Sequence, residues 1–98
     1  MKYQYQVGDR VTRVSKGLFN WSEYGPPVDT SGEIVLLHNH NGLPAYGVDW
    51  DVEGFSSCHE CGGEARSGHG YYVMEDEIWP EYMTEVDMDQ FLRLLEVI

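Results

Sequence analysis

The chain has 98 residues, of which 42% are hydrophobic and 13% aromatic, and its 17 acidic and 6 basic residues give a formal net charge of −11. This length fits one small domain, and three Trp, seven Tyr and three Phe are too many for a disordered acidic tail. The charge argues against direct binding to nucleic acid or anionic membrane, because both repel a polyanion. No apolar run of about eighteen residues and no signal-peptide pattern occurs, so we expect a cytoplasmic protein whose two cysteines are thiols or metal ligands.

Short strands dominate the first 79 residues. Alternating polar and apolar residues, or runs of β-branched and aromatic residues, indicate each of them. Asn41-Gly42 is typical of a two-residue type I′ turn, in which both residues need positive φ. The predicted strands cover residues 10–14, 32–37, 46–50, 70–74 and, as a short last one, 77–79, with Gly-rich loops over 17–32 and 51–70.

The period changes after Trp79-Pro80. Apolar residues at i, i+3, i+4 and i+7 form one stripe of an amphipathic helix, which we expect over residues 84–97. Thr84 and Asp87 resemble a capping box at its start. The stripe consists of Met88, Phe91, Leu92 and Leu95, and it either docks on the sheet or forms a contact with a second copy or a partner.

The fold class that follows is mainly β (α+β). We expect a single domain over residues 1–98, with a small barrel or antiparallel sheet over 1–79, a metal-binding loop within 51–70 and the C-terminal helix. A core this small is marginal, so an additional staple is expected.

Four short motifs carry a resemblance to a known family. They are Val-Gly-Asp-Arg-Val-Thr-Arg at 7–13, Asn-Trp-Ser at 20–22, Thr-Ser-Gly-Glu-Ile-Val at 30–35 and Tyr-Gly-Val-Asp-Trp-Asp at 46–51. In this order, over about residues 7–78, the chain resembles the SH3-like small barrels of the Mind-bomb type. The resemblance implies a small β barrel that acts as an interaction module rather than an enzyme.

The strongest chemical signal is the clustering of every cysteine and histidine between residues 38 and 69. Cys58 and Cys61 have the spacing that lets two thiolates reach one tetrahedral ion, and His69 follows eight residues later. Two thiolates and two imidazoles suit zinc, and a closed four-ligand site would be structural. We therefore predict a structural zinc site that staples the 51–70 loop.

The fourth ligand is left open among three histidines. His38 and His40 share one face of a strand near the hairpin tip, whereas His59 directly follows Cys58 and would strain the chelate. The preferred ligand set is Cys58, Cys61, His69 and His40.

Two enzyme interpretations are rejected. A thioredoxin-type pair needs a helix N-terminus that lowers the thiol pKa, but Glu60 and Glu64 flank these cysteines and Gly62-Gly63 begins no helix. His38-Asn39-His40 resembles the name of the His-Asn-His nucleases, but no helix follows this hairpin. We therefore expect a protein that is not an enzyme, and a small zinc enzyme remains only an alternative.

The acidity is local. Residues 1–20 carry a charge of +3, whereas residues 21–74 and 75–98 carry −7 each. A surface of this kind resembles the nucleic-acid backbone and complements a basic protein. The acids expected to contact the partner are Glu75, Asp76, Glu77, Glu81, Glu85, Asp87 and Asp89.

In size and charge the chain is similar to phage-encoded inhibitors of host defence nucleases, including anti-CRISPR proteins. We therefore expect a monomer or dimer that inhibits a basic nucleic-acid-handling protein, such as a Cas9-like effector nuclease, in the host cytoplasm. The alternative is an SH3-like adaptor that binds a peptide or protein through an aromatic surface, with Trp50, Tyr71, Tyr72 and Trp79 as its candidates.

Overall fold

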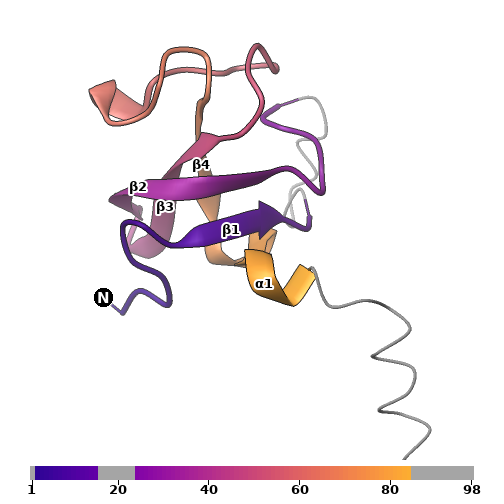
Figure 1. Ribbon diagram of the computed structural model, residues 1–98. Coiled ribbons are helices and arrows are strands. Elements are labelled where there is room, and N and C mark those ends of the chain that lie inside the picture. Colours follow the sequence, from indigo (N-terminus) through magenta and orange to yellow (C-terminus); the bar gives the residue numbers. More distant parts are fainter. Residues whose placement is uncertain (1, 16–23, 85–98) are drawn as a thin grey trace, which may run out of the picture.

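A computed structural model describes residues 2–15 and 24–84 of the chain. Its five strands form one antiparallel sheet in the order β4-β3-β2-β1-β5 (Figure 1). This confirms the expectation of a mainly β protein built on an antiparallel sheet. The elements are β1 (Arg10–Arg13), β2 (Ser31–His40), β3 (Leu43–Trp50), the 3-10 turn η1 (Cys61–Gly63), β4 (Gly70–Met74), the 3-10 turn η2 (Glu75–Glu77), β5 (Ile78–Pro80) and α1 (Glu81–Thr84).

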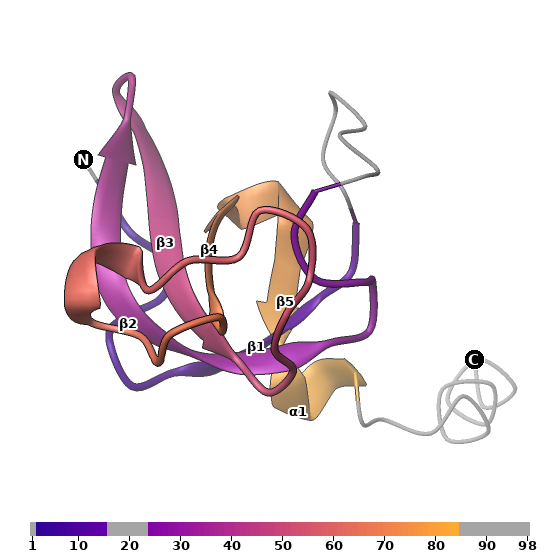
Figure 2. The same cartoon turned by 90° about the horizontal axis from the view of Figure 1, so that it is seen from above.

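The β2–β3 hairpin is the longest unit of the sheet and extends beyond its neighbours (Figure 2). Its turn has φ of 53° at Asn41 and 86° at Gly42, so the predicted type I′ geometry is confirmed. The register of the pair shifts between Ile34 and Leu36. This bulge explains why the apolar run here does not alternate, since one residue is left out of the pairing.

The core lies on one face of this sheet. Val48 and Trp50 of β3 are fully buried there, together with five further residues. Gly32 of β2 is needed for the close approach, because a Cβ at this position would lie 2.6 Å from the carbonyl oxygen of Asp49. The other five core residues are Val11, Ile34, Tyr46, Val73 and Ile78.

A buried ion pair connects the first strand, β1, to the 3-10 turn η2 that precedes the last strand. Arg13 in β1 is 1% exposed, and its Nη2 donates to Oε1 of Glu77 at 2.9 Å. The second oxygen of Glu77 accepts the backbone N–H of Met74 at 2.6 Å. The guanidinium also donates to the carbonyl oxygens of Tyr24 and Pro26, at 3.1 and 2.8 Å. The start of β5 is therefore held to β1 by this ion pair as well as by the backbone hydrogen bonds between the two strands.

The N-terminal segment packs on the core through Tyr46. The rings of Tyr3 and Tyr5 lie edge-on to the Tyr46 ring, with centroids 5.7 and 5.5 Å away. The Tyr46 hydroxyl donates to Oε1 of Glu75 at 2.5 Å and accepts the backbone N–H of Gln4 at 3.1 Å. One buried hydroxyl thus connects β3, the 3-10 turn η2 and the N-terminal segment.

The C-terminal helix predicted over residues 84–97 falls almost wholly outside the described residues. A short helix, α1, covers Glu81–Thr84 and reaches the predicted start at Thr84, so the helix predicted over 84–97 stays a prediction. Pro80 directly precedes α1, where its fixed φ suits the entry to a helix and its missing N–H ends the ladder of β5. Residues 85–98, including the predicted stripe, are not described. Within 2–15 and 24–84, no helix is long and apolar enough to cross a membrane.

Breaking the buried ion pair should destabilise the fold strongly. Arg13→Met or Glu77→Gln leaves one buried charge without its partner, and each is expected to lower the free energy of unfolding by about 3–5 kcal/mol. Urea unfolding followed by tryptophan fluorescence measures this change. Arg66→Gln, which removes an exposed ion pair, is the matched control and should cost less. Equal losses for the buried and the exposed pair would contradict the role given to Arg13.

The Tyr46 hydroxyl should make stability depend on alkaline pH. Burial, and then the bond to Glu75, raises the pKa of Tyr46 to about 12, against about 10 in an unfolded chain. Because the unfolded state loses this proton first, the stabilisation is complete below pH of about 10 and is lost towards pH 12. Tyr46→Phe should flatten the decline of unfolding free energy over this range. Tyr82→Phe, at a side chain that is 71% exposed, is the control that should leave the decline unchanged.

Candidate functional site

The four predicted zinc ligands are placed in different surroundings. Cys61 is fully buried, with its Sγ 4.0 Å from the carbonyl oxygen of Val48. Cys58 is half-buried, and His40 is exposed near the end of the β2–β3 hairpin. Nδ1 of His69 lies 2.8 Å from the carbonyl oxygen of Trp50. Among the described residues no group of three or more His, Cys, Asp or Glu is arranged to hold a metal ion, so the zinc site stays a prediction.

The two remaining histidines pack on Tyr72. The ring of His38 lies 4.8 Å from the Tyr72 ring and that of His59 lies 5.1 Å from it, centroid to centroid. Nδ1 of His59 also accepts the backbone N–H of Cys61 at 2.9 Å. Both histidine rings therefore pack on Tyr72, and the His59 ring also accepts a backbone hydrogen bond in its own turn.

The 51–69 loop is held by protein contacts that the sequence did not reveal. His59 pairs with Gly70 as an added bridge beside β4, with N···O distances of 2.9 and 2.7 Å. Arg66 grips both carboxylate oxygens of Asp49, the shortest contact being Nη2 to Oδ1 at 2.8 Å, and this bond lowers the pKa of Asp49. The side chain of Cys61 fills space against Gly47 and Gly70. Protein contacts therefore hold this loop in place, which weakens the argument that its stability requires a metal ion.

Three of the acids predicted to contact a partner have structural roles. Glu75 accepts the Tyr46 hydroxyl, and Glu77 is buried against Arg13. Oε2 of Glu81 lies 2.8 Å from Nε of Arg10. Asp76 is exposed, whereas Glu85, Asp87 and Asp89 lie outside the described residues. Of the predicted set, Asp76 is the described member that is exposed and makes no ion pair with a residue in 2–15 or 24–84.

Every arginine within the described ranges is bound to a carboxylate of the same chain. Besides Arg13 and Arg66, Arg10 contacts Asp51 at 2.5 Å as well as Glu81. Fewer of the exposed acidic side chains take part in ion pairs. Those that make no ion pair with a described residue are Asp29, Glu33, Glu60, Glu64 and Asp76. The outward field of this part of the protein is therefore acidic.

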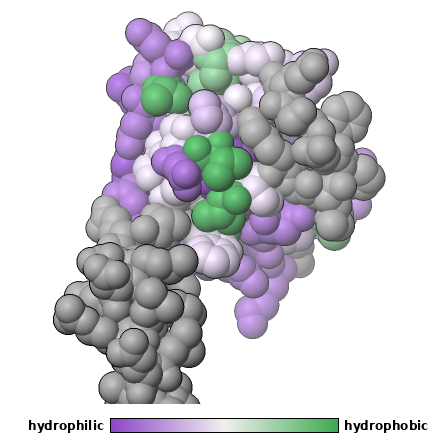
Figure 3. Space-filling model, turned by 90° about the vertical axis from the view of Figure 1, so that its right-hand side faces the viewer, coloured by the Kyte–Doolittle hydropathy of each residue, from purple (hydrophilic) through white to green (hydrophobic). Residues whose placement is uncertain are grey.

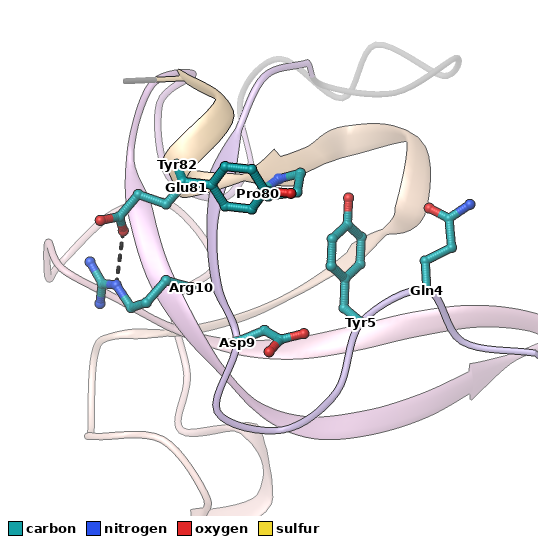
Figure 4. A pocket seen from close by; sticks show the side chains of 7 residues that line it. All are labelled: Gln4, Tyr5, Asp9, Arg10, Pro80, Glu81 and Tyr82. Atoms are coloured by element: carbon teal, nitrogen blue, oxygen red, sulfur yellow. Dashed lines mark hydrogen bonds and ion pairs between the residues drawn. The ribbon is translucent and has the colours of Figure 1, made fainter. Parts of the chain in front are cut away.

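A cavity of about 410 Å³ opens between the N-terminal segment, β1 and the β5–α1 junction (Figure 4). The rings of Tyr5 and Tyr82 and the carboxylate of Asp9 border it. Burial raises the pKa of Tyr5, and the nearby carboxylates of Glu75 and Asp9 add to this rise. The cavity thus combines aromatic faces with negative charge. The complete lining is Gln4, Tyr5, Asp9, Arg10, Pro80, Glu81 and Tyr82.

The predicted aromatic surface is only partly present. Trp50 is fully buried, and Tyr71 and Tyr72 are half-buried. Trp79 of β5 is 54% exposed and Tyr82 of α1 is 71% exposed. Tyr82 was not among the candidates, because its isolated position before the predicted helix gives no periodic signal. Two exposed aromatic side chains therefore lie at the β5–α1 junction, and one of them, Tyr82, lines the cavity. Tyr24 is a further exposed ring, at 42%.

Comparison with protein-family models, with curated proteins and with solved structures finds no match to this chain.

The two thiols should differ in reactivity in metal-free protein. Burial raises the pKa of Cys61 to about 11, so little thiolate forms and the side chain is shielded. After treatment with a chelator, iodoacetamide should modify Cys58 in the native state and Cys61 only on unfolding, as mass spectrometry of peptides would show. Rapid modification of both thiols would contradict the buried position of Cys61.

The predicted zinc site has its own test. If the prediction is right, elemental analysis finds one zinc per chain, zinc protects Cys58 from alkylation, and Cys58→Ser or Cys61→Ser loses the metal. A metal-free native protein whose unfolding midpoint does not change with zinc would remove the prediction.

Proposed function

We propose that this chain is a non-enzymatic acidic protein that binds a basic nucleic-acid-handling protein and inhibits it, as an anti-CRISPR protein inhibits a Cas9-like nuclease. The observation that supports this proposal is the one-sided charge of its surface. Arg10, Arg13 and Arg66 are each neutralised within the chain, while five exposed acids make no ion pair with a described residue.

The exposed acids are carried by segments that the sheet holds in place. Glu33 lies on β2, and Glu60 and Glu64 flank the 3-10 turn η1. Asp29 precedes β2, and Asp76 lies in η2. Hydrophilic residues likewise border the small apolar patches on the face shown in Figure 3. Fixed carboxylates of this kind imitate the phosphates of a nucleic acid.

Inhibition would follow from competition for a basic groove. Nucleases of this class hold their nucleic acid in a positively charged channel that contacts the backbone. A complementary acidic protein associates quickly with such a channel and excludes the nucleic acid. The attraction weakens with salt, because mobile ions screen it.

The second candidate function is an SH3-like adaptor. One observation favours it: Trp79 and Tyr82 are both exposed at the β5–α1 junction. Such a module would bind a peptide through these rings rather than through the exposed acids.

Reversing the exposed acids should abolish inhibition without unfolding the protein. The variant replaces Asp29, Glu33, Glu60, Glu64 and Asp76 by Lys; each reversal adds two charges, which takes the formal net charge from −11 to −1. Cleavage of DNA by a purified Cas9-like nuclease is measured with each form of the protein at about 50 and 200 mM salt. The natural sequence should inhibit, more weakly at the higher salt, and the variant should lose at least about tenfold in potency.

The controls separate the two candidate functions. Far-ultraviolet circular dichroism and the unfolding midpoint check that the five-residue variant is folded. Trp79→Ala with Tyr82→Ala is the matched variant that leaves the charge unchanged. Equal inhibition by the natural sequence and the lysine variant would refute electrostatic competition. Binding lost only with the aromatic variant would instead identify the adaptor.

A further inference from the structure

The cavity beside the β5–α1 junction has the chemistry of a receptor for one basic side chain. Figure 4 shows the side chains of Asp9 and Arg10 extending in opposite directions, with Arg10 turned towards Glu81. The Arg10–Glu81 pair neutralises itself, with Nε 2.8 Å from Oε2. Asp9 makes no ion pair with any residue in 2–15 or 24–84. Within the described residues the charge of Asp9 is therefore not neutralised by an ion pair, and it can pair with a basic ligand.

One oxygen of Asp9 is already engaged, which fixes the side chain. Its Oδ2 accepts the backbone N–H of Gln6 at 3.0 Å, so the carboxylate is oriented by its own turn. The second oxygen has no hydrogen bond to a described residue that would compete with a ligand. Tyr5 is held in place as well, since its ring packs edge-on against Tyr46 and its hydroxyl lies 3.5 Å from the carbonyl oxygen of Ile78.

We infer that this cavity binds the guanidinium group of an arginine presented by the basic partner, between the carboxylate of Asp9 and the rings of Tyr5 and Tyr82. The inference rests on the proposed function and names the contact by which the partner would be held. Guanidinium is planar and carries five N–H donors, so it can pair with a carboxylate while it stacks on an aromatic face. The alkyl stem would lie along Pro80, which also lines the cavity.

Other ligand classes fit this lining less well. An anion would meet the charge of Asp9, because Arg10 and Glu81 neutralise each other. An uncharged apolar group would bury Asp9 and the amide of Gln4 without satisfying them, which is costly. A volume of about 410 Å³ accommodates one long side chain but not a folded element.

The test uses N-acetyl-arginine amide as the probe and N-acetyl-citrulline amide as its uncharged counterpart of the same shape. The full chain, labelled with ¹⁵N, is titrated with each and followed by nuclear magnetic resonance. The arginine probe should shift the amide signals of Asp9, Arg10 and Tyr82. Citrulline should bind at least about tenfold more weakly, because it lacks the charge that strengthens the bond to Asp9.

Variants locate the binding. Asp9→Asn keeps an acceptor for the Gln6 N–H but removes the charge, and it should weaken arginine binding about tenfold. Tyr82→Ala, at an exposed ring, should weaken it several-fold, and Asp76→Asn, at an exposed acid outside the lining, should leave it unchanged. Equal binding of arginine and citrulline, or shifts spread over the exposed acids, would overturn the inference.

The two proposals can fail separately. If the lysine variant loses nuclease inhibition while the arginine probe does not bind the cavity, the cavity inference is wrong and the proposed function stands. If the probe binds as expected but the natural sequence does not inhibit the nuclease, the proposed function is wrong and the cavity remains an arginine site.

Discussion

The buried ion pair between Arg13 and Glu77 is the interaction on which the rest of this small fold depends. One guanidinium reaches the carbonyl oxygens of Tyr24 and Pro26 and the carboxylate of Glu77, and it lies 5.4 Å from the centre of the Tyr71 ring. Removing two charges from water is costly, and it is compensated only when their hydrogen bonds are satisfied inside. Here they are, because no described buried side-chain nitrogen or oxygen lacks a partner. The hydrogen bonds of the pair therefore offset the cost of burying its charges, and they connect β1 to η2 and to the segment at Tyr24 and Pro26.

The pairing of the described arginines with carboxylates also determines the charge of the surface. A chain with 17 acids and 6 bases repels itself. Each of its three described arginines pairs with at least one carboxylate from another part of the sequence. Arg10 joins β1 to Asp51 and Glu81, and Arg66 joins the 51–69 loop to Asp49 in β3. Each such pair holds two distant segments of the chain together and neutralises a positive charge at the surface. Stability and an acidic surface therefore arise from the same contacts.

The sheet could be predicted from the sequence more fully than the site. Alternation and the Asn41-Gly42 turn depend on neighbouring residues, so they reveal strands and hairpin without knowledge of the fold. Glu77 looked like one more surface acid, because its burial depends on Arg13, 64 residues away. The Cys58–Cys61 spacing predicted a metal, but spacing does not show that the thiol of Cys61 lies under β3 and β4. Pairings between residues distant in sequence leave no local pattern.

The cavity at the β5–α1 junction belongs with these long-range features, and its rigidity follows from them. Tyr5 lines the cavity and packs on Tyr46, whose hydroxyl is bonded to Glu75. Glu75 begins the 3-10 turn η2 that ends at Glu77, the partner of Arg13. The buried ion pair thus supports the wall of the cavity through one short turn and one tyrosine. Tyr5 would therefore lose little side-chain freedom on binding the proposed ligand, because its ring is already packed. In so small a protein, the contacts that keep the sheet together also order one wall of the proposed arginine site.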